Sequence, residues 1–158
     1  MRSGTVNVAG VVGMAAALRV TTAHRADDVA RVGVLRDRLA AGLEAIDGAV
    51  AHGDRTRVVA GNHHLRFDGV AAEALLVALD HEGVCAAAGS SCASGAAEPS
   101  HVLQAMGLSR DDARAAVRFS LGVTSTESDI DRALDVVPHA VEQLRGRTRS
   151  TRPAPALR

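Results

Sequence analysis

Lysine is absent from this sequence of 158 residues, so all eighteen of its basic side chains are arginines. By itself the chain therefore cannot perform chemistry that needs a primary amine on a side chain. Tyrosine and tryptophan are absent as well, and only two phenylalanines are present. Because 47% of the residues are hydrophobic but only 1% are aromatic, the core has to be built mainly from alanine, valine, leucine and isoleucine.

The chain also lacks an excess of charge and a long apolar run. Its formal net charge is zero at pH 7, which gives no reason to expect direct binding to nucleic acid or to an anionic membrane. Arg19 interrupts the apolar stretch at residues 6–20, which stays below the ~18 residues of a membrane span and precedes no signal-peptide cleavage pattern. We therefore expect a cytoplasmic protein in which Cys85 and Cys92 are free thiols.

The first third of the chain has the apolar spacing of a helix over residues 7–47. Two apolar stripes recur at helical intervals, the first formed by Val8, Val11, Val12, Ala15 and Leu18, the second by Val32, Leu35, Leu39, Leu43 and Ile46. Residues 21–25 are either a break or a polar turn of one long helix. Residues 36–38 lie off the second stripe, and we expect them to be solvated.

The remainder alternates short strands with helices. Strands are predicted at residues 50–54, 57–60, 62–67, 84–87 and 116–121, and helices at residues 71–81, 100–106, 109 onward and 126–145. Gly83 and Ser109 are typical of a helix end and a helix start. This order predicts an α+β fold with helices packed on one face of a small, mostly antiparallel sheet. The polar, proline-containing residues 147–158 are expected to form a disordered tail.

One segment, residues 88–100, consists almost wholly of small residues and contains Cys92. A loop of this composition packs weakly and can move, as a side chain that passes a group between partners must do. Composition alone leaves two readings open for Cys92, a reactive thiol and one more small loop residue. Cys85 lies among apolar neighbours in a predicted strand, and we interpret it as a core residue.

Several motifs in one order resemble the carboxy-terminal domain of cysteine desulfurases, which are pyridoxal-phosphate-dependent enzymes of the class-V aminotransferase family. The motifs are RSGT at residues 2–5, EALL at 73–76, GSSCAS at 89–94, EPSHVL at 98–103, MGL at 106–108, VRFSLG at 117–122 and DID at 129–131. The resemblance covers about residues 2–145. It implies the small domain of a fold-type-I enzyme, with residues 1–47 as interdomain linker and long helix and residues 48–146 as the cysteine-bearing small domain.

The resemblance also implies roles for three residues. Cys92 matches the nucleophile that takes sulfur from L-cysteine, leaving alanine and a persulfide. Arg118 matches the arginine that binds the substrate carboxylate, although a surface ion pair is the alternative. Thr5 matches a threonine that contacts the cofactor phosphate of the other subunit, which implies a homodimer. A plain helix cap is the alternative for Thr5.

By this resemblance, the sulfur would pass to an acceptor protein such as an iron–sulfur scaffold, for cluster assembly or for thiolated tRNA. Selenocysteine lyase uses related chemistry and is a nearby alternative. The large domain of the family, which supplies the lysine for pyridoxal phosphate, is expected outside this sequence. We therefore predict that the chain alone is inactive unless a large-domain chain joins it. A non-catalytic persulfide carrier and an inactive truncated remnant with an exposed first stripe remain alternatives.

The sequence departs from the family pattern in two places. Val123 stands where arginine is common, and residues 63–66 carry His63, His64 and Arg66 in place of an apolar–Asn–apolar–Ser pattern. Adjacent histidines on a strand point to opposite faces of a sheet. His63 and His64 therefore cannot easily serve one ion together, and we expect no metal site from them with Cys92.

Overall fold

The computed structural model describes residues 4–88 and 99–150, with the side chains of residues 148–150 left out. Its elements follow one another as α1 (Val8–Glu44), β1 (Ala49–Ala51), the 3-10 helix η1 (Arg55–Arg57), β2 (Asn62–Phe67), α2 (Ala72–His81), β3 (Ala87–Ala88), α3 (His101–Ala105), α4 (Arg110–Ala115), β4 (Ala116–Ser120) and α5 (Glu127–Ser150). Within these described residues, no helix is both long enough and apolar enough to cross a membrane.

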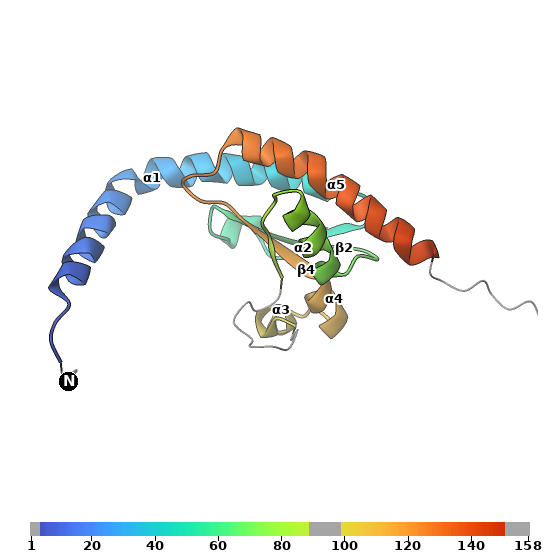
Figure 1. Cartoon of the computed structure of the whole chain (residues 1–158), viewed down its shortest axis with the longest axis horizontal. Helices are drawn as coiled ribbons and strands as arrows, with labels where there is room; N and C mark the ends of the chain where they lie inside the picture. The colour runs from blue at the N-terminus through green and yellow to red at the C-terminus, as the bar shows by residue number, and fades with distance from the viewer. Residues whose placement is uncertain (1–3, 89–98, 151–158) are drawn as a thin grey trace, which may run out of the picture.

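Four strands form one antiparallel sheet in the order β1-β2-β4-β3. Side chains alternate along a strand, so the central pair presents Leu65, Phe67, Val117 and Phe119 on one face, where all four are buried. Helices α1, α2 and α5 pack on this face and complete the main core, and Figure 1 shows α1 and α5 running side by side across it. The expected α+β architecture, a long helix leading into a small antiparallel sheet, is therefore confirmed.

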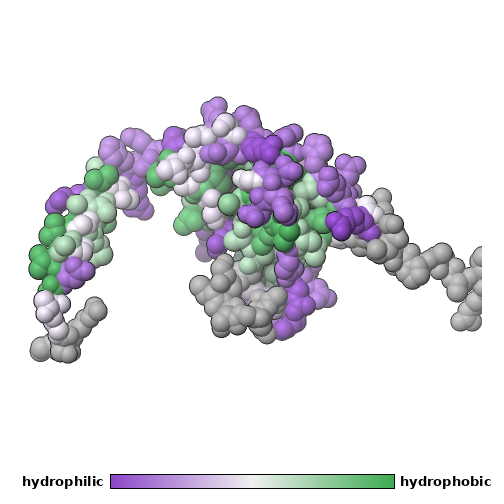
Figure 2. Space-filling model, viewed as in Figure 1, coloured by the Kyte–Doolittle hydropathy of each residue, from purple (hydrophilic) through white to green (hydrophobic). Residues whose placement is uncertain are grey.

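Helix α1 is continuous through residues 21–25, which settles the choice between a break and a polar turn. Its second half is held in the core by Val32, Leu35, Leu39 and Leu43, all at most 6% exposed. Its first half projects away from the sheet as an arm (Figure 1). The valines and leucine of the first stripe are exposed there, between 53% at Val11 and 66% at Val8 and Leu18, and Figure 2 shows hydrophobic side chains along this arm.

Arg36 corrects one expectation, because it is buried rather than solvated. Its position follows Val32 by four residues and precedes Ala40 by four, so helical spacing places it on the buried face. Its guanidinium pairs with the exposed carboxylate of Asp37 at 2.6 Å between Nε and Oδ1. The apolar stripe is thus wider than its leucines and valines alone indicate.

Several of the predicted strands are shorter or absent, and the one expected at 50–54 is limited to Ala49–Ala51. Residues 57–60 form no strand, because Asp54 accepts hydrogen bonds from the backbone N–H of Thr56 at 2.8 Å and from its hydroxyl at 2.6 Å, which starts a 3-10 turn instead. The strand expected at 84–87 is limited to Ala87–Ala88 at the edge of the sheet. Cys85 precedes this strand and is exposed, so its interpretation as a core residue was wrong.

The helix ends follow the predicted signals. The hydroxyl of Ser109 accepts a hydrogen bond from the N–H of Asp112 at 3.1 Å, which caps α4. Gly83 follows α2 with a φ of 74°, the left-handed conformation that glycine adopts at low cost. Helix α5 continues to Ser150, so residues 147–150 are helical, whereas they were expected to begin the disordered tail. The rest of that tail, 151–158, lies outside the described residues.

Gly61 offers a test of this packing. Its carbonyl accepts a hydrogen bond from the N–H of Leu121 at 2.7 Å, and a Cβ at position 61 would overlap the Leu121 carbonyl oxygen. Since backbone atoms cannot move aside as a flexible side chain does, we expect Gly61→Ala to lower the free energy of unfolding by about 1–3 kcal/mol. Urea denaturation followed by circular dichroism measures the change.

Gly33→Ala is the matched control, because Gly33 lies inside α1 and a Cβ added there would meet no atom within 4 Å. This substitution should stabilise the chain by up to ~1 kcal/mol through helix propensity and a less flexible unfolded state. Equal effects of the two substitutions would contradict the close approach at Gly61.

Candidate active site

Arg118 lies at the centre of β4 on the face of the sheet opposite the core. Its neighbours Val117 and Phe119 point into the core, so the alternation of the strand turns Arg118 outward, and its side chain is exposed. In the register of the sheet, Arg118 stands between His64 on β2 and Ala87 on β3. Within residues 4–88 and 99–150 it forms no ion pair with a carboxylate, so the surface ion pair considered for it is not formed there.

A cleft of about 600 Å³ opens beside this arginine, between the middle of α1 and one end of the sheet. Its polar lining comes from Arg118, Asn62, Ser120 and Asp28, and its apolar lining comes mainly from valines. Asn62 and Ser120 are paired in register on β2 and β4, and by alternation both lie on the face that carries Arg118. A guanidinium without a carboxylate partner, next to amide and hydroxyl groups, suits the carboxylate of a small molecule.

Cys92 lies outside the described residues, so its predicted role as nucleophile remains a prediction. The described chain reaches its segment at Ala88 and resumes at Pro99. Ala88 pairs with Val117, and Ala87 pairs with Arg118. The chain therefore enters the cysteine-bearing segment from the strand directly beside Arg118.

Thr5 is not brought near Arg118 within this chain. It lies exposed in the residues before α1, which begins at Val8. Asn7, not Thr5, caps this helix, because its side-chain oxygen accepts a hydrogen bond from the N–H of Gly10 at 3.0 Å. A contact between Thr5 and a cofactor phosphate in another subunit stays a prediction.

The histidines of β2 point to opposite faces, as predicted from the strand period. His63 is 4% exposed and lies under the helices, with its Nε2 atom 3.8 Å from Glu44 Oε1. His64 lies on the Arg118 face, with its ring centre 5.6 Å from that of His52. Within the described part of the chain, no group of three or more histidine, cysteine, aspartate or glutamate side chains could hold a metal ion.

These environments disfavour protonation of the imidazoles. Burial lowers the pKa of His63, partly opposed by the carboxylate of Glu44. Burial, together with electrostatic interactions with His52 and Arg118, lowers the pKa of His64 to about 4. His64 is therefore neutral at physiological pH.

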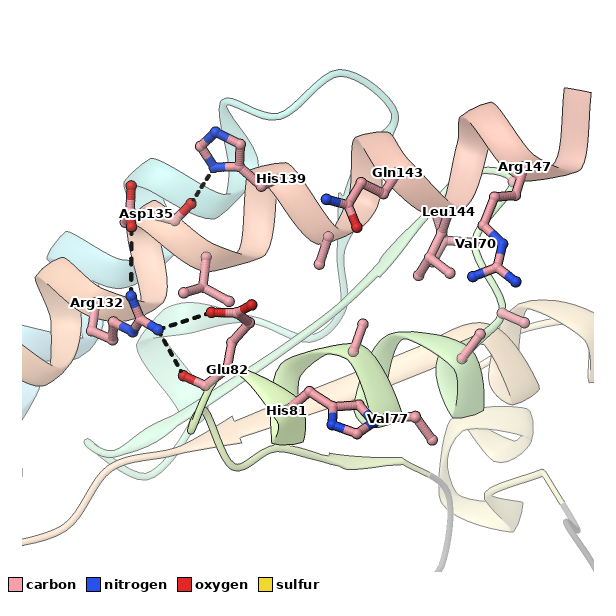
Figure 3. Close-up of a pocket in the computed structure, with 16 residues that line it drawn as sticks. Val70, Val77, His81, Glu82, Arg132, Asp135, His139, Gln143, Leu144 and Arg147 are labelled. Atoms are coloured by element: carbon pink, nitrogen blue, oxygen red, sulfur yellow. Dashed lines mark hydrogen bonds and ion pairs between the residues drawn. The ribbon is translucent and has the colours of Figure 1, made fainter.

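A larger hollow lies elsewhere, as a groove of about 870 Å³ between α2 and α5 (Figure 3). Arg132 spans one end, where its Nη2 atom lies 3.0 Å from Glu82 Oε2 and its Nη1 atom lies 3.8 Å from Asp135 Oδ2. His139 contacts the Asp135 carbonyl oxygen at 2.7 Å through Nδ1. These polar groups are already paired with one another, and no predicted site residue lines the groove.

Several residues that line the Arg118 cleft were not predicted from the sequence. Asn62 and Ser120 could have been found, because the two-residue period places them on the face of Arg118 once β2 and β4 are paired. Asp28 could not, because only the packing of α1 across the sheet brings it to the cleft. His52 was also overlooked, since its place beside His64 depends on the backbone pairing of β1 with β2.

Known proteins with similar sequences indicate the family of this chain. The family model described as aminotransferase class-V matches residues 1–133. An IscS-like cysteine desulfurase of Mycobacterium tuberculosis is 46% identical over 147 residues, which are 92% of this chain and 37% of that protein. A cysteine desulfurase IscS of Shewanella baltica is 38% identical, over 92% of this chain and 35% of that protein.

A solved structure described as a NifS-like protein superposes on 90% of this chain and 35% of its own, with a TM-score of 0.78 and 27% sequence identity. The chain thus spans little more than a third of the length of the curated relatives it matches.

Acid should destabilise this fold through His64. Its pKa is lower in the folded chain, at about 4, than the ordinary value of 6.5 that the unfolded chain regains. Protons therefore bind the unfolded state first, and stability that is complete above about pH 6.5 should fall by about 1–3 kcal/mol as the pH drops toward 4. Urea denaturation at a series of pH values measures this loss.

In His64→Asn, part of this pH dependence should disappear, because asparagine is polar and does not titrate. His139→Asn is the control, since His139 is exposed on α5. An unchanged pH profile in His64→Asn would show that the titration of His64 is not coupled to unfolding.

Proposed function

Since this chain belongs to the class-V aminotransferase family, we propose that it is the carboxy-terminal part of a cysteine desulfurase whose Cys92 receives sulfur from L-cysteine. One observation carries the proposal: Arg118 lines a cleft with no carboxylate partner in the described chain, on the strand that pairs with the residues leading into the Cys92 segment. The site so formed has a carboxylate binder and a thiol at neighbouring positions of one small domain.

In this proposal, Arg118 binds the carboxylate of the amino-acid substrate through two parallel hydrogen bonds. Asn62 and Ser120, in the same cleft, are polar enough to help orient it. The thiolate of Cys92 takes the substrate's sulfur atom and becomes a persulfide. The exchange balances without another reactant, because a thiol and cysteine give a persulfide and alanine.

The residues of this chain do not fit pyridoxal phosphate as a covalent anchor, because the sequence contains no lysine. Thr5 has a hydroxyl that could contact the phosphate of the cofactor, and it lies exposed just before α1 begins. A separate lysine-bearing chain would then supply the anchor, and a homodimer would bring Thr5 to the cofactor phosphate of the other subunit. By itself the chain is proposed to be inactive, and its sulfur would go on to an acceptor such as an iron–sulfur scaffold.

Cys92 should gain one sulfur atom when the reduced chain is incubated with a persulfide donor such as glutathione persulfide. The outer sulfur atom moves to the thiolate, and glutathione leaves as its thiolate. Mass spectrometry of the intact chain and of its tryptic peptides measures the gain and its place.

Cys85→Ser is the matched control for Cys92→Ser, because Cys85 is an exposed thiol of the same chain. The first variant should keep the gain and the second should lose it. Persulfide on Cys85 alone, or on neither cysteine, would contradict both the desulfurase proposal and a persulfide-carrier role.

Arg118 can be tested once the lysine is supplied. We suggest joining this chain behind the cofactor-binding part of the Mycobacterium tuberculosis relative and measuring alanine release from L-cysteine. Arg118→Lys should lower kcat/KM by about tenfold or more, chiefly through KM, because an ammonium cannot form the paired bonds of a guanidinium. Arg114→Lys is a control on the exposed surface of α4.

The exposed arm of α1 should determine whether the isolated chain self-associates in solution. Its exposed valines and leucine form an apolar surface that another domain or chain would cover, so the chain alone should self-associate. Val12→Glu combined with Leu18→Glu should shift the population toward monomer, as measured by sedimentation velocity. A wild-type chain that is monomeric at high concentration would contradict this expectation.

A further inference from the structure

His52 and His64 form a pair of imidazoles that the proposed desulfurase chemistry does not use. The N–H of His52 donates to the carbonyl oxygen of His64 at 2.8 Å, which continues the β1–β2 ladder beyond the last residue of β1. Paired residues of neighbouring strands project to the same side of a sheet. The two rings accordingly lie 5.6 Å apart between centres, tilted by 52°.

Both rings carry a nitrogen atom whose hydrogen-bonding capacity is unused in the described chain. His52 Nε2 and His64 Nδ1 are buried and have no hydrogen-bond partner. Both residues line a cavity of about 80 Å³ at the connection between β1 and β2, which is enough for an ion or a few water molecules. Buried polar atoms usually have a partner, so both nitrogen atoms are available to a ligand that enters this cavity.

We propose that His52 and His64 together bind a divalent transition-metal ion, with Zn²⁺ as the representative, and that water completes its coordination. A zinc ion lies about 2.0–2.1 Å from each ligating imidazole nitrogen in tetrahedral sites, which places two such ring centres roughly 5–6 Å apart. The observed separation of 5.6 Å falls in that range without movement of the backbone.

The protonation state of the pair suits a metal ligand. Burial lowers the pKa of His52 and of His64, so both imidazoles are neutral at physiological pH and no proton has to leave before a metal binds. Neutral imidazole is a good ligand for zinc, copper and nickel ions.

Neighbouring charges are partly compensated. Arg66 lies near His52, and its Nε atom pairs with Asp112 Oδ1 at 2.9 Å while its Nη1 atom pairs with Asp68. The carboxylate of Asp112 also acts on His52 and favours a cation there. Arg118 is the one guanidinium near His64 that no described carboxylate pairs, and its exposure allows water to screen its charge.

The pair formed by His63 and Glu44 is a weaker choice for a metal site. His63 Nε2 and Glu44 Oε1 lie 3.8 Å apart and line the same cavity. Arg55 already pairs with that carboxylate, and Arg36 acts on His63 as well. A metal ion there would displace an existing ion pair and face two guanidinium groups. The proposal therefore rests on His52 and His64.

Isothermal titration with ZnCl₂ tests the site, on chain whose cysteines have been alkylated with iodoacetamide so that no thiolate competes. We expect one zinc ion per chain, with binding at least about tenfold weaker in His52→Ala and in His64→Ala, because one imidazole remains in each. His139→Ala, which removes an exposed histidine of α5, should bind as the unsubstituted chain does.

Nuclear magnetic resonance of the unsubstituted chain gives a second measurement that does not depend on the variants folding. Zinc should shift the ring resonances of His52 and His64 and leave those of His139 and His81 in place. Absence of binding up to millimolar zinc, or binding kept by the His52→Ala, His64→Ala double variant, would overturn the proposal. Because the alkylated chain cannot carry persulfide, this result is independent of the outcome for Cys92.

Discussion

The pairing of β2 with β4 is the interaction on which the rest of this molecule depends. Five residue pairs in register, from Asn62↔Ser120 to Arg66↔Ala116, fix which side chains enter the core and which remain outside. Shifting the register by one residue would exchange the two faces. It would then bury Arg118 and expose Phe119. The hydrophobic core and the candidate substrate cleft are therefore two consequences of one ladder.

The structure could be predicted from the sequence where a single residue period, that of a strand or of a helix, dominates a segment. The alternation in β2, the helix α5 and the cap at Ser109 each follow from local chemistry, and each was predicted correctly. The errors arose where a side chain competed with the backbone or where an edge ended. Asp54 turned a predicted strand into a 3-10 helix, and the shortness of β3 left Cys85 exposed. Contacts of the site that join distant elements, such as Asp28 with the end of the sheet, have no local signal.

The candidate site holds only some of the groups that the proposed reaction needs. Arginine is the only strongly basic residue type of this sequence, and one arginine stands in the cleft without a carboxylate partner in the described chain. A guanidinium keeps its charge at every physiological pH, so it can bind a carboxylate but cannot form an imine. Recognition of a substrate and formation of an imine are thereby assigned to different parts of the assembly proposed above.

The continuity of α1 carries a mechanical consequence. A helix of 37 residues rises about 1.5 Å per residue, so the arm and the core-packed half form one continuous helix with a path of roughly 55 Å, which curves between the two halves in Figure 1. Any domain that binds the arm is therefore connected to the sheet through continuous helical backbone. Relative motion between such a domain and the cleft then requires bending of α1 itself, bending of the chain before Val8, or sliding along the arm.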